Sequence, residues 1–219
     1  LEQAGRILDT SASKLEVRRN SEWLVKLDIV DILRLTGQFT VQQMLHRESF
    51  KNRLADGREV MISEFMYPLM QAYDSVVVEA DVELGGTDQL FNLLLGRELQ
   101  KGFGQAPQIV LTMPLLEGLA GTQKMSKSLD NYVSVDEPPN DMYGKLMSLP
   151  DELIVSYLEY LTDTPTEELD QLTRDLAANS ITPMTVIKSL ALDITGQFHG
   201  LELAQTAQAN FEQVVQGRS

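Results

Sequence analysis

Apolar side chains recur at helical spacing through residues 15–54 of this 219-residue chain. Positions three or four residues apart lie on one face of an α-helix, so this segment is predicted to be mostly helical. Its apolar positions include Trp23, Leu24, Leu27, Ile29, Ile32 and Leu33. A further helix is predicted after Ser63, which we interpret as its cap, and Pro68 leaves its first turn undefined. The apolar stripe of that helix consists of Phe65, Met66, Leu69, Met70 and Tyr73.

The pattern then changes to short apolar runs on either side of a helix. A strand is predicted at residues 82–84, a glycine-containing turn at 85–87, a helix at 88–101 and a second strand at 109–111, before Pro114. This order of strand, turn, helix and strand is typical of a parallel α/β sheet, which is the predicted fold class.

After Asp136 the whole pattern is helical. An amphipathic face is formed by Leu153, Ile154, Tyr157, Leu158 and Leu161. Two helix starts are predicted to carry proline at the first helical position. The first is Thr164-Pro165, where Glu167 would complete a capping box, and the second is Thr182-Pro183, whose helix should end at Gly200. The sequence therefore predicts an α/β domain at residues 1–135 and a small all-helical domain at 136–219.

Composition narrows the possible functions. The content of 43% hydrophobic and 23% charged residues is that of a globular protein. A net charge of −14 argues against a broad nucleic-acid footprint, so any RNA contact should be local. The absence of cysteine excludes disulfides and thiolate metal sites and permits a reducing cytoplasm. No apolar run approaches the length of a membrane span, and the start does not resemble a signal peptide.

One candidate site is the row Tyr67, Gln71 and Asp74 in YPLMQAYD. Positions i, i+4 and i+7 share one helix face, which would project a phenol, an amide and a carboxylate from an otherwise apolar helix. Such a row suits a small ligand with an ammonium group at one end and a hydroxyl at the other. A solvated helix face is the alternative interpretation.

A second candidate is GGTDQ, which runs from Gly85 to Gln89. Glycines at the carboxyl end of a strand let a ligand approach the backbone, and the following helix start offers free N–H groups. Asp88 could accept a hydrogen bond from a ribose hydroxyl. A simple capped turn would give the same five letters.

The third candidate is the loop GTQKMSKS, where Lys124 and Lys127 are surrounded by glycine and serine. Two lysines in such a loop could neutralise the charge that develops on a polyphosphate, and Ser126 and Ser128 could add hydroxyl donors. A short lysine pair is otherwise a common feature of solvated loops.

The letters KMSKS resemble the second signature of the class I aminoacyl-tRNA synthetases. The stretch from YPLMQAYD through ELGGTDQ to KMSKSLDNYV, with the helical tail, resembles the bacterial tyrosyl-tRNA synthetases over essentially the whole chain. The resemblance implies the C-terminal part of a Rossmann-like nucleotide-binding domain with a helical insertion, followed by a small helical domain. Residues 15–64 resemble the insertion that forms the dimer interface in that family.

For the amino acid, the resemblance implies that Tyr67 and Gln71 hold the amino group of tyrosine. Asp74 corresponds to the residue that reads the phenolic hydroxyl, and Gln89 lies near the amino acid. Glu83 stands where many relatives carry glutamine, and its role is left open.

For ATP, the resemblance implies that Gly86 and Asp88 line the adenylate, with Asp88 at the ribose. Lys124 and Lys127 correspond to the catalytic lysines that stabilise the departing pyrophosphate, and Ser126 lies between them in the ATP site. No metal-ligating residue is assigned, and Mg²⁺ is expected to accompany ATP. Attack of a carboxylate on the α-phosphate needs positioning and charge neutralisation more than a covalent nucleophile.

The first class I signature, of the HIGH type, does not occur, and His46 in MLHRESF does not match it. We therefore expect a fragment that lacks the HIGH-containing part and the C-terminal RNA-binding domain, and that is inactive alone. The full-length protein is expected to be a cytoplasmic homodimer that uses tyrosine, ATP and tRNA(Tyr), without membrane contact. Two alternatives remain, which are a relative specific for tryptophan and a non-catalytic binding or dimerisation module.

Overall fold

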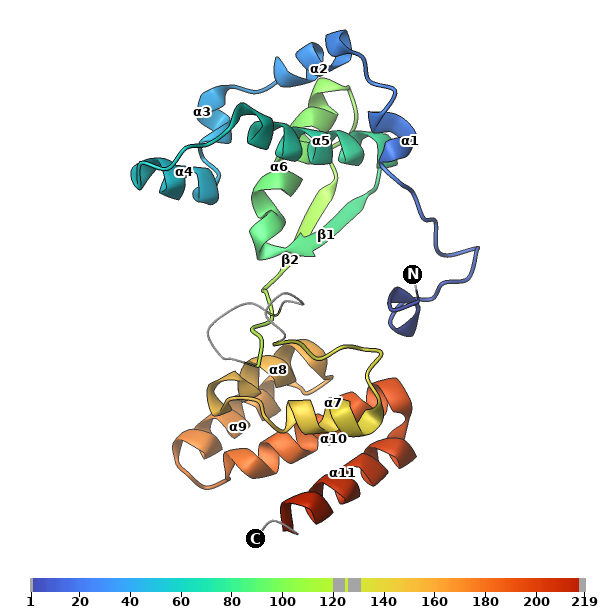
Figure 1. Ribbon diagram of the computed structural model, residues 1–219, viewed down its shortest axis with the longest axis vertical. Helices are drawn as coiled ribbons and strands as arrows, with labels where there is room; N and C mark the ends of the chain where they lie inside the picture. The colour runs from blue at the N-terminus through green and yellow to red at the C-terminus, as the bar shows by residue number, and fades with distance from the viewer. Residues whose placement is uncertain (1, 120–124, 126–130, 217–219) are drawn as a thin grey trace. The chain divides into compact units, whose positions relative to one another are not determined.

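The computed structural model describes residues 2–119, 125 and 131–216 (Figure 1). It contains two compact units, which we describe separately. One is Glu16–Leu115, and the other combines Leu1–Leu15 with Leu116–Ser219. The domain division expected from the sequence, at 135/136, stays a prediction. In the described ranges no helix has the length and apolar character needed to cross a membrane.

The unit formed by residues 16–115 is an α/β unit. Its elements are α1 (Ser21–Leu24), α2 (Ile29–Thr36), α3 (Val41–Met44), α4 (Glu48–Ala55), α5 (Ile62–Val78), β1 (Val82–Gly86), the 3₁₀ turn η2 (Thr87–Gln89), α6 (Leu90–Gly102) and β2 (Ile109–Met113). The two strands pair in parallel, with Val82 opposite Ile109. Helix α6 packs against α5 and against both strands (Figure 1). The predicted parallel α/β arrangement is confirmed.

The core of this unit lies where α5 meets α6. Its buried apolar side chains are Leu35, Met44, Leu69, Ala72, Val76, Leu95 and Leu99. The two helices approach closely because Gly96 faces Ser75, and a Cβ on Gly96 would lie only 2.5 Å from Ser75 Oγ. This close crossing fixes the part of α5 that carries Gln71 and Asp74.

One face of the two-stranded sheet is apolar and exposed. Alternate residues of both strands have exposed fractions between 48% and 68%, and they are Val82, Leu84, Ile109, Leu111 and Met113. Because successive side chains of a strand point to opposite faces, these residues share one face. The other face meets α6, since a Cβ on Gly85 would lie 3.0 Å from Leu93. Parallel sheets are usually covered on both faces, so the apolar face is the surface against which a second helical layer would pack.

The glycines of GGTDQ belong to the strand and not to a turn, which corrects the prediction. Gly85 and Gly86 pair with Thr112 and Met113, and the turn begins only at Thr87. Gly86 has an ordinary φ of −71°, so no left-handed conformation requires glycine there. The reason is close packing, because a Cβ on Gly86 would lie 2.8 Å from Leu115 Cδ2.

Helix α5 begins two residues before the predicted start. Met61 is its N-cap, and Ser63 already lies inside the helix, so the prediction of a Ser63 cap is wrong. Glu64 determines the start, because its Oε1 accepts a hydrogen bond of 2.9 Å from the Met61 N–H. The helix continues through the buried Pro68 to Val78.

Glu64 should make the stability of this unit depend on pH. Its hydrogen bonds with the Arg53 guanidinium and the Met61 N–H lower its pKa from 4.5 to about 2. A carboxylate whose pKa is depressed by folding stabilises the protein above its unfolded pKa, and this contribution is lost as pH falls from about 4.5 towards 2. Between pH 6 and pH 2.5, Glu64→Gln should therefore lose less of its unfolding free energy than the wild type does.

Urea unfolding followed through the single tryptophan, Trp23, measures this difference. Asp56→Asn is the matched control, because Asp56 pairs with Arg58 at 2.7 Å on the exposed surface, where ion pairs contribute little. Equal pH dependence in Glu64→Gln and the wild type would contradict the assignment.

The second unit is helical. Its elements are η1 (Ala4–Arg6), α7 (Pro139–Leu146), η4 (Asp151–Leu153), α8 (Ile154–Leu161), α9 (Thr166–Ala177), α10 (Pro183–His199) and α11 (Leu201–Gln216). Its core is built around fully buried side chains, which include Met142, Tyr143, Leu146, Ile154, Tyr157 and Leu190. The predicted small helical part that follows the α/β part is confirmed.

The two proline helix starts have different outcomes. Thr182 caps α10 as predicted, since its hydroxyl accepts a 3.3 Å hydrogen bond from the Thr185 N–H, and Gly200 ends the helix with a φ of 85°. The predicted capping box at Thr164 is wrong. Pro165 is itself the N-cap of α9 and supplies no side-chain hydrogen bond, while the Thr164 hydroxyl bonds to Thr162.

Candidate functional site

Gln71 and Gln89 come together on neighbouring helical elements, α5 and η2. Asn92 joins them, because its Nδ2 donates to Gln71 Oε1 at 2.9 Å and to Gln89 Oε1 at 3.2 Å. Asn92 is only 1% exposed, so the two amides are held against a fixed donor. Sequence reasoning missed Asn92, although its spacing of three residues after Gln89 places both side chains on one helical face. Tyr67, one turn before Gln71, is 65% exposed.

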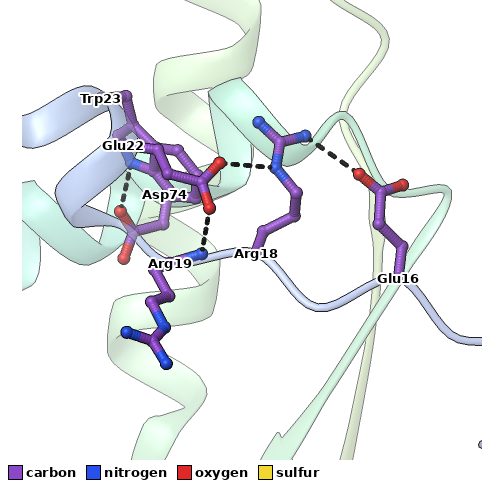
Figure 2. A network of polar contacts seen from close by, with 6 residues as sticks. All are labelled: Glu16, Arg18, Arg19, Glu22, Trp23 and Asp74. Atoms are coloured by element: carbon purple, nitrogen blue, oxygen red, sulfur yellow. Dashed lines mark hydrogen bonds and ion pairs between the residues drawn. The ribbon is translucent and has the colours of Figure 1, made fainter.

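Asp74 is held by two donors from the N-terminal end of the unit. Trp23 Nε1 donates to Asp74 Oδ1 at 2.7 Å, and Asn20 Nδ2 donates to Oδ2 at 3.3 Å. Figure 2 shows the Trp23 indole pointing directly at the carboxylate. A carboxylate offers about four acceptor positions, so Asp74 can accept a further hydroxyl while these two bonds stay in place. Sequence reasoning missed Trp23 and Asn20, which were assigned only to helix packing or left unassigned.

The Trp23 ring is itself positioned by a charged cluster (Figure 2). The Arg18 guanidinium lies 5.4 Å from the ring centroid, and Arg18 Nε donates to Glu22 at 3.1 Å. Glu22 also accepts from the Arg19 N–H at 3.0 Å, and the Arg19 and Arg18 donors lower the pKa of its carboxyl. These groups keep the indole N–H aimed at Asp74.

Asp88 lies exposed at the carboxyl end of β1. Its Oδ2 accepts a hydrogen bond of 3.1 Å from Gln89 Nε2, which links it to the amide cluster. A Cβ on Gly86 would lie 2.6 Å from Asp88 Oδ1, so glycine leaves room for this carboxylate beside the strand backbone. A cavity beside Asp88 and Gln89 has its other wall on α4 and the two residues before it, where it is lined by His46, Arg47, Glu48, Ser49 and Asn52.

Glu83, whose role the sequence left open, belongs to a polar network behind the site. Its Oε2 accepts from Ser75 Oγ at 2.7 Å and also from Gln108 Nε2. Gln108 in turn bonds to the buried Gln100, whose Nε2 donates to the Ser75 carbonyl at 3.2 Å. The network ties β1 to the turn of α5 that follows Asp74. The predicted residues Lys124, Ser126 and Lys127 lie outside the described residues.

A comparison with protein families places this geometry in a known context. Residues 2–216 match the model of the family described as tRNA synthetases class I (W and Y). The chain belongs to this family.

Curated relatives of this chain are named tyrosine–tRNA ligase. The chain is 51% identical over 215 residues to a tyrosine–tRNA ligase of Thermotoga maritima, and the aligned region covers 98% of this chain and 53% of the relative. It is 54% identical over 202 residues to a tyrosine–tRNA ligase of Symbiobacterium thermophilum, and this alignment covers 92% of this chain and 49% of the relative. The chain thus spans about half the length of the curated relatives it matches.

A solved class I structure shows the same fold. The tyrosyl-tRNA synthetase of Archaeoglobus fulgidus, determined in complex with L-tyrosine, aligns with a TM-score of 0.66 and 25% identity. The alignment covers 90% of this chain and 68% of that one. The expected fold, part of a Rossmann-like synthetase domain followed by a helical domain, is therefore confirmed.

Proposed function

We propose that the full-length protein containing this chain is a tyrosine–tRNA ligase. It activates tyrosine with ATP to form tyrosyl-adenylate and then transfers the tyrosyl group to tRNA(Tyr). The observation that carries the proposal is the position of Asp74, whose carboxylate is fixed by Trp23 while Gln71 lies one turn away on the same helix. The names of the relatives and the tyrosine in the Archaeoglobus fulgidus structure agree with this proposal.

In this proposal the protein recognises tyrosine at its two polar ends, the phenolic hydroxyl and the ammonium group. Asp74 accepts the phenolic O–H, and phenylalanine would leave this carboxylate without that bond, which opposes its binding. Tyr67 and Gln71 hold the ammonium group, and Gln89 lies beside the amino acid. The hydrogen bonds from Asn92 limit how the Gln71 and Gln89 amides can turn.

Formation of the adenylate is proposed to use the carboxyl end of β1. Gly86 and Asp88 line the nucleotide, with Asp88 at the ribose, and Lys124, Ser126 and Lys127 bind the phosphates. The two lysines neutralise charge as pyrophosphate departs. Mg²⁺ commonly reaches such sites with the phosphates and uses few protein ligands. The described ranges contain no group of three or more His, Asp or Glu side chains that could hold a metal.

Amino-acid-dependent ATP–pyrophosphate exchange tests the proposed function. The full-length protein should exchange with tyrosine and charge tRNA(Tyr), whereas the 219 residues alone should exchange little or not at all. Exchange that depends on tryptophan would favour the tryptophan-specific alternative, which belongs to the same family. A full-length protein without exchange would favour a binding or dimerisation module.

A chain without cysteine is compatible with the reducing cytoplasm, where we propose that the enzyme acts.

The full-length protein is also proposed to be a homodimer through the segment 15–64. This segment exposes large apolar side chains, with Val25 76%, Ile29 71% and Leu33 64% exposed. Ile29 and Leu33 lie one turn apart on the same face of α2. Leu33→Lys should therefore raise the dimer dissociation constant at least tenfold, because a charge would be buried in the contact.

Sedimentation velocity over a concentration series measures this dissociation. Leu203→Lys is the control, since Leu203 is 50% exposed on α11 of the helical unit. If both variants dissociate like the wild type, α2 does not form the dimer contact.

A further inference from the structure

The chain enters and leaves the segment 120–130, which contains Lys124 and Lys127, on the helical unit. The flanking residues Leu116, Leu119 and Val133 pack against the core that α7, α8 and α10 form. The helices of this unit therefore determine the position of the incoming flank, residues 116–119, and of the outgoing flank, residues 131–137.

The two flanks contact each other directly. The Leu119 N–H donates to the Asn131 carbonyl at 2.9 Å. Gly118 is buried beneath Asn131, and a Cβ there would lie 2.2 Å from Asn131 Nδ2 and 2.7 Å from its carbonyl oxygen. A side chain at position 118 would push the flanks apart, so glycine is required by this approach.

Helix α8 holds the incoming flank. The Tyr157 hydroxyl donates to the Glu117 carbonyl at 2.6 Å, and Tyr157 is only 1% exposed. Burial, with a smaller effect of the Glu117 charge, raises the pKa of this phenol to about 12, so it remains a donor over the physiological range. One buried hydroxyl thus fixes the backbone three residues before the segment.

Helix α7 holds the outgoing flank through Lys145. Its Nζ pairs with Glu137 Oε1 at 2.7 Å, donates to the Tyr132 carbonyl at 3.2 Å and lies 5.1 Å from the centre of the Tyr132 ring. Glu137 Oε1 also accepts from the Ser134 N–H at 3.0 Å. The Glu137 side chain is only 14% exposed, so this ion pair is partly shielded from water and is worth more than a surface pair. Lys145 therefore joins Tyr132 and Glu137 of the outgoing flank to helix α7.

We propose that Lys145 and Tyr157 are positioning residues for adenylate formation, because they fix the two ends of the segment that carries Lys124 and Lys127. This inference rests on the proposed function. The reach of a side chain in a segment depends on where its ends are held, and a displacement of about 1 Å at reacting groups can lower a rate a hundredfold. Neither residue is proposed to touch a substrate.

The expected signature is a separation of kcat from KM. The residues proposed to bind tyrosine lie on α5, η2 and the start of α6, so loosening the flanks leaves the KM for tyrosine unchanged. The kcat of tyrosine-dependent exchange should fall about tenfold in Lys145→Met and severalfold in Tyr157→Phe. Lys145→Arg keeps the charge and the donors and should recover most of the rate.

The experiment uses the full-length protein and two matched controls. Lys188→Met makes the same chemical change in the same unit, since Lys188 pairs with Glu212 at 2.7 Å with a similar exposure of 36%. Tyr160→Phe removes a hydroxyl from α8, three residues after Tyr157. Exchange kinetics are measured for all variants, and circular dichroism melting shows which of them fold.

The outcomes separate the two proposals. A wild type without tyrosine-dependent exchange overturns the proposed function and this inference with it. If the wild type is active, two results overturn the inference alone. One is that Lys145→Met and Tyr157→Phe keep the kcat of their controls, and the other is that these variants change the KM for tyrosine instead of kcat. Should Lys145→Met fail to fold, Tyr157→Phe against Tyr160→Phe decides. A lowered kcat with unchanged KM and rescue by Lys145→Arg supports it.

Discussion

Replacement of Asp74 by alanine is expected to lower kcat/KM for the proposed tyrosine activation by the full-length protein at least about a hundredfold. The Asp74 carboxylate would accept the hydrogen bond of the phenolic hydroxyl, and hydrogen bonds to charged groups contribute about 1.5–3 kcal/mol. In addition, Trp23 Nε1 and Asn20 Nδ2 would lose their acceptor in the partly buried site. Tyrosine-dependent pyrophosphate exchange with the variant measures the effect.

Two companion variants show whether the loss is specific. Asp74→Asn keeps the shape of the side chain and should reduce the preference for tyrosine over phenylalanine, because the site no longer depends on a hydroxyl donor. Trp23→Phe removes only one donor to Asp74 and should lower kcat/KM about three- to tenfold. Unchanged tyrosine kinetics in Asp74→Ala would remove this residue from the tyrosine site.

Replacement of Leu99 by alanine is expected to lower the unfolding free energy of the α/β unit by about 2–5 kcal/mol. Leu99 is fully buried on α6, in the cluster that joins this helix to α5. Truncation removes apolar contacts and leaves a cavity that the close α5–α6 crossing at Gly96 prevents from collapsing. Trp23 lies in the same unit and is the only tryptophan of the chain, so its fluorescence during urea unfolding reports this transition.

Leu94→Ala is the matched control for this measurement. Leu94 is on the same helix but is 46% exposed, so its truncation should cost less than about 1 kcal/mol. If the two variants unfold at the same urea concentration, the α5–α6 contact is not the core that stabilises the unit.

Local patterns in the sequence were sufficient for the order of elements. Helical spacing predicted α5 and α8, and short apolar runs predicted both strands, because periodicity directly reflects which side chains are buried. Helix α10 was predicted from its Thr182-Pro183 start and its end at Gly200. The failures lie at element ends. Ser63 and Thr164 have the right chemistry for caps, but the carboxylate of Glu64 and the backbone of Pro165 determine those two starts. Cap propensity is a weak preference that a neighbouring hydrogen bond overrides.

For the candidate site, too, local spacing was predictable from the sequence, whereas contacts between separate elements were not. The sequence by itself determined that Gln71 and Asp74 share one face of a helix, since the spacing of three residues has one geometric meaning there. Only the tertiary structure decided that Trp23 donates to Asp74 from 51 residues away and that Asn92 bridges Gln71 and Gln89. It also decided that a Cβ on Gly86 would meet the side chains of Leu115 and Asp88. These contacts depend on how separate elements pack, and the period of a single helix or strand carries no information about its neighbour.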